Sequence, residues 1–120
     1  MFVKEIEWIN EEYREAVIVV SDSVNEVRCF ADQFKNQLFD ELSETLECID
    51  VKNIYLNCEK KTFIEELDSD FEYHIGGVLY SKEEGIICVG KLRFHIYADL
   101  IPGDIYDNDY IEFITMRVDI

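Results

Sequence analysis

The stretch FEYHIGGVLYSKEEGIICVGKLRFHIY, residues 71–97, decides the fold class of this chain. Its β-rich first part ends at the polar loop 82–85, where Gly85 suits the left-handed conformation that closes a longer hairpin loop. The run 86–97 then returns as a second strand. The pair Gly76–Gly77 interrupts the first strand, which is typical of a bulge or a bend at a barrel corner. The stretch therefore predicts a long hairpin in a small β-barrel.

Further strands are predicted on both sides of this hairpin. Residues 2–9, 13–20 and 24–31 are β-rich runs separated by short polar turns, which indicates a three-stranded meander. The segment 16–20 is apolar on both faces, as in a central barrel strand. Residues 110–118 form the last predicted strand and would close the barrel.

Between the meander and the hairpin, the apolar period changes from two residues to four. The members of this period are Phe34, Leu38, Leu42 and Leu46. With Asp32 as the N-cap, they predict an amphipathic helix over residues 33–47, between the third and fourth strands. Thr62 and Glu65 match a capping box and predict one further helical turn.

Composition supports a single folded domain over residues 1–120. The chain is 48% hydrophobic and has eight Phe and seven Tyr, so it can build a core of ordinary size. No run approaches the roughly 20 apolar residues that span a bilayer, and the first residues show no signal peptide. We therefore expect a mostly β protein, a small barrel with one helix, located in the cytoplasm and without a membrane partner.

Three segments carry a resemblance to known proteins. They are IPGDIYDNDYIEF at 101–113, EIEWIN at 5–10 and VVSD at 19–22. In the first, Asn108 stands where a glycine is usual, a replacement that its tolerance of positive φ allows. Together these segments resemble a group of small, acidic, uncharacterised bacterial proteins with an OB-like barrel. The resemblance implies the fold and assigns no activity to any residue.

The charge of the chain opposes the usual function of such a barrel. There are 27 acidic and 11 basic residues, giving a net charge of −16. Phosphate attraction supplies most non-specific nucleic-acid affinity, so no nucleic-acid partner is expected. Eleven of the acidic residues fall between positions 40 and 72. The candidates for docking a basic protein there are Asp40, Glu41, Glu44, Glu65, Glu66, Asp68 and Asp70.

The favoured function is a non-enzymatic interaction module that docks a basic protein, as small immunity or inhibitor proteins do. One alternative is a small-molecule or metal-dependent enzyme whose site at the barrel mouth holds His95 or Cys88 beside a carboxylate. The other is a nucleic-acid binder with a local basic patch formed by Lys52, Lys60, Lys61, Lys82, Lys91 and Arg93. No catalytic residue and no cofactor is assigned, and the sequence leaves open whether copies of the chain associate.

The possible metal ligands and the cysteines are both interpreted as structural residues. The carboxylates near the last turn are Asp104, Asp107, Asp109 and Glu112. They are the only metal candidates, but their spacing is not that of an EF-hand and their preference for turns explains them. The four cysteines are Cys29, Cys48, Cys58 and Cys88. They contain no Cys-x-x-Cys pair and are predicted to be reduced, structural thiols.

Overall fold

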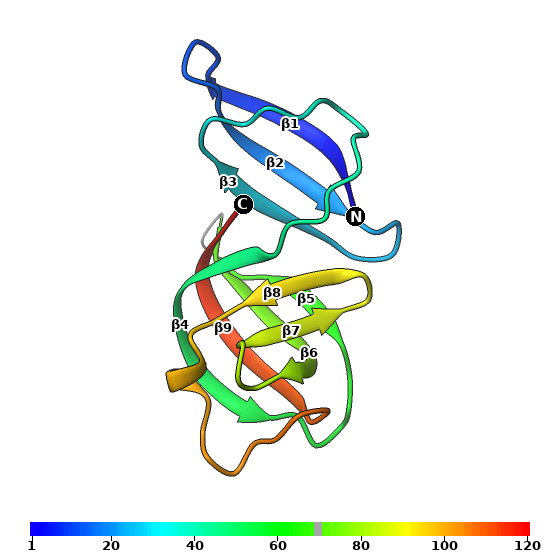
Figure 1. The fold of residues 1–120 in the computed structure, drawn as a ribbon, viewed down its shortest axis with the longest axis vertical. Coiled ribbons are helices and arrows are strands. Elements are labelled where there is room, and N and C mark those ends of the chain that lie inside the picture. Colours follow the sequence, from blue (N-terminus) through cyan, green and yellow to red (C-terminus); the bar gives the residue numbers. More distant parts are fainter. Residues whose placement is uncertain (69–70) are drawn as a thin grey trace.

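The computed structural model describes residues 1–68 and 71–120 and shows a mostly β protein (Figure 1). Its elements are β1 (Phe2–Asn10), β2 (Glu15–Ser21), β3 (Glu26–Ala31), β4 (Leu46–Leu56), β5 (Phe63–Glu66), β6 (Tyr73–Ser81), β7 (Ile86–Val89), β8 (Leu92–His95), the 3-10 turn η1 (Ala98–Leu100) and β9 (Tyr110–Asp119). In the part of the chain that the structure describes, no helix has the length and apolar character needed to cross a membrane.

Five strands close into a barrel in the order β4-β9-β6-β7-β8, and β8 returns to β4. All contacts between neighbours are antiparallel except the parallel contact of β4 with β8. The strand β9 is central, because it pairs with β4 on one side and with β6 on the other. Phe94 and Phe113 are fully buried inside the barrel. The prediction of a β-barrel is therefore confirmed.

The meander β1-β2-β3 is antiparallel, as predicted, but it lies outside the barrel (Figure 1). It sits over one end, so that the molecule is elongated, with extents of 46 × 26 × 24 Å. The pair Phe30–Asp119 joins β3 to β9, and the buried hydrophobic cluster runs without a break from the meander into the barrel. Within the apolar run 16–20, Ala16, Ile18 and Val20 belong to this cluster, whereas Val17 and Val19 face the other side of the meander.

The predicted amphipathic helix over residues 33–47 is wrong. The chain there is irregular until β4 begins at Leu46, and Gln33 and Phe39 have positive φ angles of 52° and 68°, which a right-handed helix excludes. The backbone N–H of Phe39 donates to the Val3 carbonyl at 2.7 Å, and the N–H of Val3 donates to the Asp40 carbonyl at 3.0 Å. These long-range bonds along β1 satisfy the backbone groups that a helix would have paired locally.

Two smaller predictions also differ from the structure. The expected helical turn at residues 62–67 is the short strand β5, paired with β6, because the tertiary contact overrides a weak capping signature. The single strand expected over 86–97 is broken into β7 and β8 by a tight turn at Gly90, whose φ is 58°. This turn is what allows β8 to reach β4 and close the barrel.

Asp22 fastens the β2–β3 turn of the meander to the β7–β8 turn of the barrel. Its carboxylate accepts the backbone N–H of Val24 and Asn25 at 2.9 and 2.6 Å, and that of Lys91 at 2.8 Å. Partial burial of the carboxylate raises its pKa, but these hydrogen bonds outweigh burial and lower the pKa from 3.8 to about 2.

We expect Asp22→Asn to destabilise the protein at neutral pH by about 1–3 kcal/mol, because charge-assisted bonds to the backbone weaken. A group with a lowered folded-state pKa stabilises above its unfolded value, and this stability is lost as the pH falls from about 4 through about 2. Urea unfolding of both proteins across this window tests the prediction. The difference between them should shrink with acid, whereas Asp104→Asn, at an exposed turn position, should behave like the parent at every pH.

Candidate docking groove

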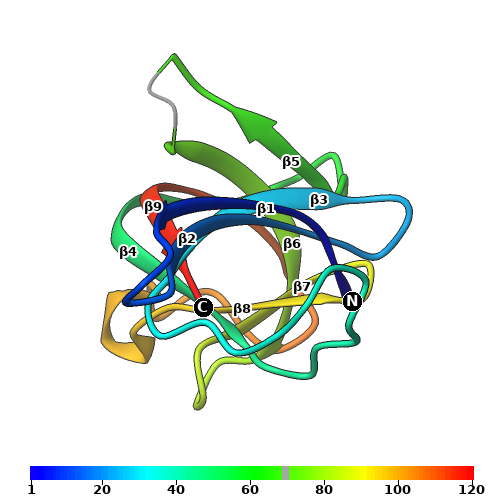
Figure 2. The same cartoon turned by 90° about the horizontal axis from the view of Figure 1, so that it is seen from above.

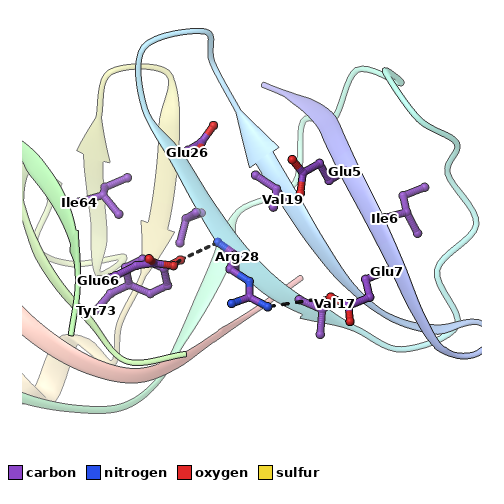
Figure 3. A pocket seen from close by; sticks show the side chains of 11 residues that line it. Glu5, Ile6, Glu7, Val17, Val19, Glu26, Arg28, Ile64, Glu66 and Tyr73 are labelled. Carbon is purple, nitrogen blue, oxygen red and sulfur yellow. Dashed lines mark hydrogen bonds and ion pairs between the residues drawn. The ribbon is translucent and has the colours of Figure 1, made fainter. Parts of the chain in front are cut away.

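A groove of about 480 Å³ separates the outer face of the meander from the β5–β6 hairpin (Figure 3). It is lined by Glu5, Ile6, Glu7, Val17, Val19, Glu26, Val27, Arg28, Ile64, Glu66 and Tyr73. Residues far apart in the sequence meet here, and Figure 2 shows the β5–β6 hairpin standing out sideways from the barrel. We define these residues as the docking groove.

Strand alternation builds the meander wall of the groove. Glu5 and Glu7 are two residues apart on β1, so they share one face of the strand. The register places Glu5 opposite Val19 and places Val19 opposite Arg28, which forms a row across all three strands. Because the other face of the meander covers the hydrophobic cluster, the charged side chains are confined to the groove side.

The opposite wall comes from β5 and β6. The Tyr73 hydroxyl accepts the backbone N–H of Arg28 at 3.0 Å and donates to Glu66 Oε1 at 3.3 Å, so it links the two walls at the floor of the groove (Figure 3). Burial raises the pKa of Tyr73 to about 12. The hydroxyl therefore keeps its proton at physiological pH and holds the β5–β6 hairpin at a fixed distance from β3.

Acidic side chains outnumber basic ones in the groove by four to one. Arg28 lies 4.0 Å from Glu7 and places its guanidinium 5.2 Å from the ring centre of Phe71, which is just outside the groove. Glu26 is paired with Lys4 at 2.5 Å. Among the described residues, Glu5 and Glu66 have no basic group within ion-pair distance. The groove therefore offers uncompensated negative charge on both of its walls.

The structure divides the predicted docking residues between two surfaces. Glu66 lines the groove, and Glu65 points from the other face of β5 toward His74, 3.9 Å away. Asp68 is exposed just after β5, and Asp70 lies outside the described residues. Asp40, Glu41 and Glu44 belong to the segment 32–45, which runs on the opposite side of the meander from β5 (Figure 2). The predicted acidic surface is thus not continuous.

Sequence reasoning missed Glu5, Glu7 and Glu26, which form most of the acidic lining. The signal was present in the alternation of β1, where acidic and apolar residues take turns. What the alternation could not show is that the charged face of the meander would lie against a second element instead of open solvent.

The metal candidates do not converge on a common point. Asp107 Oδ1 accepts the backbone N–H of Lys82 at 2.7 Å, and Asp109 Oδ2 accepts that of Tyr106 at 2.8 Å. Glu112 lies on β9 and faces His74 at 3.5 Å, while Asp104 is exposed. Across residues 1–68 and 71–120, no group of three His, Cys, Asp or Glu side chains is arranged to hold a metal. The two central carboxylates shape the turn before β9.

The basic side chains of the suggested local patch occupy several separate segments. Lys61 is paired with Glu59 at 2.9 Å. Arg93 lies 5.2 Å from the ring centre of Tyr80, and Lys82 lies 5.2 Å from that of Tyr106. These two tyrosines are exposed, and each has a basic neighbour. An exposed ring beside a cationic side chain is the arrangement on which a base can stack.

The residues suggested for an enzymatic site, His95 and Cys88, do not form one site. His95 Nδ1 lies 2.8 Å from Glu47 Oε2, so a histidine does stand beside a carboxylate. Cys88 is on β7 opposite Arg93, and neither His95 nor Cys88 lines the docking groove. A nucleophile, a base and a cavity are thus not gathered in one place by these residues.

The four cysteines are all free. Cys29 and Cys48 are buried, and burial raises the pKa of both thiols well above its ordinary value. Burial also raises the pKa of Cys88, which is partly buried. Cys58 is exposed, in contrast to the expectation that all four cysteines are structural thiols.

Alkylation of the native protein should therefore follow exposure. We expect iodoacetamide at pH 8 to modify Cys58 first and Cys88 more slowly, because the thiolate is the reactive form. Cys29 and Cys48 should react only on unfolding. Peptide mass spectrometry over time tests this order, and early modification of Cys48 would show that the region between β3 and β4 opens in the native state.

No family model, no curated protein and no solved structure matches this chain.

Proposed function

We propose that this protein is a non-enzymatic interaction module that docks a basic protein segment in the groove between the meander and the β5–β6 hairpin. The observation that carries the proposal is the acidic lining of a groove shared by two elements, with one arginine against four glutamates. A cavity of this kind attracts cationic side chains and repels polyanions.

The whole-molecule charge supports the same class of partner. At a net charge of −16, the field around the protein accelerates encounter with a basic molecule, and contacts in the groove then select it. Val17, Val19 and Ile64 add apolar surface between the carboxylates. A basic segment that also carries apolar side chains therefore fits the lining better than a uniformly charged one.

The type of small barrel is part of this proposal as well. We infer that the neighbours in the five-stranded ring pair as in an OB-like barrel, but that the chain enters and leaves the ring at different strands. The reason is that the parallel contact joins the first and fourth strands of the ring, β4 and β8. Small barrels of this kind host many unrelated functions. The fold alone thus does not choose among binding partners.

The proposal is tested with a capped, fluorescein-labelled peptide of four Lys-Val repeats as the probe. We expect fluorescence anisotropy to show binding at low ionic strength that weakens as salt is added. The variant Glu5→Gln, Glu7→Gln, Glu66→Gln should bind at least about tenfold more weakly, because the groove loses three negative charges.

The matched control removes the same charge elsewhere. Glu11→Gln, Glu12→Gln, Glu84→Gln alters three exposed turn residues and should change the affinity by less than about threefold, since only the long-range field differs. Equal losses in the two variants would mean that net charge alone attracts the probe. Tight binding of single-stranded DNA, lost in Tyr80→Ala and Tyr106→Ala, would instead favour the nucleic-acid function.

A further inference from the structure

The strand β5 has a free edge beside the docking groove. It pairs with β6 on one side only and ends the order of the sheet. The N–H of Leu67 donates to the Glu72 carbonyl at 2.9 Å, so these two residues form a hydrogen-bonded antiparallel pair. Hydrogen-bonded pairs alternate with non-bonded pairs along such a ladder. The backbone groups of Glu65 and Phe63 therefore point to β6, whereas those of Ile64 and Glu66 point away from it.

The same two residues, Ile64 and Glu66, line the groove with their side chains. In the ladder with β6, Ile64 is opposite Ile75 and Glu66 is opposite Tyr73, and by the alternation these are the non-hydrogen-bonded pairs. Each therefore offers one N–H and one C=O to an added strand, and Figure 3 shows both side chains on the hairpin side of the groove. Side chains of the added strand that face the same way as Ile64 and Glu66 would point to Glu5 and Glu7 across the groove.

Charge decides which strand can bind. Glu65 and Glu66 make half of β5 acidic, so pairing with β5 of a second copy would place like charges beside one another. An extended basic segment has the opposite charge at the same positions. We propose that the docking groove binds an extended basic segment of a partner protein by antiparallel strand addition to β5, with its cationic side chains directed to Glu5, Glu7 and Glu66.

This inference rests on the proposed function, and it adds a backbone requirement that charge attraction alone does not have. In antiparallel addition, residues directly opposite Ile64 and Glu66 share their face and form the hydrogen-bonded pairs. The lysines of the Lys-Val probe face the groove, so the lysine N–H groups donate to β5. The valine N–H groups point to solvent.

Two N-methylated versions of the probe separate these roles. Methylation of the lysine backbone nitrogens removes the donors that β5 needs, and we expect the affinity to fall at least about tenfold, equivalent to 1.4 kcal/mol. Methylation of the valine backbone nitrogens, at the same number of positions, should change the affinity by less than about threefold. All three peptides carry the same charge and the same side chains.

Equal binding of the three peptides would overturn strand addition while leaving the acidic docking groove in place. Equal loss in both methylated peptides would also overturn it, because the effect would then belong to the peptide and not to its register on β5. Failure of the unmethylated probe to bind, or binding that ignores the groove variant, would overturn the proposed function itself. Loss confined to the lysine-methylated peptide supports the inference.

Discussion

We expect a chain that ends at Asp109 to unfold without a cooperative transition. This truncation removes β9, which pairs with both β4 and β6 and also meets β3 at Asp119. It takes away the fully buried side chains of Ile111, Phe113 and Val118. Each large core side chain contributes about 2–5 kcal/mol, against a total stability of roughly 5–15 kcal/mol, so the barrel cannot remain closed. Circular dichroism and a thermal melt test the result.

Two point substitutions on β9 separate the contribution of its buried side chains from that of its exposed ones. Phe113→Ala should cost about 3–5 kcal/mol, because it leaves a cavity at the centre of the barrel. Met116→Ala, at a side chain that is 41% exposed, should cost less than about 1 kcal/mol. A truncated protein that melted cooperatively near the midpoint of the full chain would show that β9 is not the strand that closes the barrel.

The strands could be predicted from the sequence because alternation and turn residues are local signals. The structure confirms the three meander strands, the strand at residue 110 and the left-handed positions of Gly85 and Asn108, with φ angles of 70° and 73°. The helix could not be excluded locally, since the spacing of Phe34 and Leu42 suits a helix and an irregular cover equally. The choice between them depends on backbone bonds to β1 that only the folded chain reveals.

The docking groove was predictable only in its sign of charge. Its acidic residues come from β1, β3 and β5, and no local pattern reports that the outer face of a meander will lie against a distant hairpin. The prediction grouped acidic residues by their closeness in sequence, which placed Glu41 and Glu66 together. In the fold they lie on opposite sides of the meander. The segment 32–45 runs beside β1, whereas β5 pairs with β6 on the other side (Figure 2).

The second large effect is expected at Gly85, which closes the loop between β6 and β7. Its φ of 70° lies in the left-handed region, and a Cβ there would collide with the carbonyl oxygen of Ile96. The neighbouring backbone cannot withdraw freely, since the N–H of Ile96 donates to the Gly85 carbonyl at 2.9 Å. Gly85→Ala should therefore cost on the order of 3 kcal/mol, combining left-handed strain of about 1–2 kcal/mol with the steric displacement of a bonded chain.

Gly103→Ala provides the matched control, because no atom lies within 4 Å of the Cβ that it would add. The change should alter stability by no more than about 0.5 kcal/mol, and in the stabilising direction if it acts through the entropy of the unfolded chain. Urea unfolding of the two variants beside the parent gives both values. Similar small effects at the two glycines would mean that the loop 82–85 can move away from Ile96, and that the close approach is not required to hold β8 in the barrel.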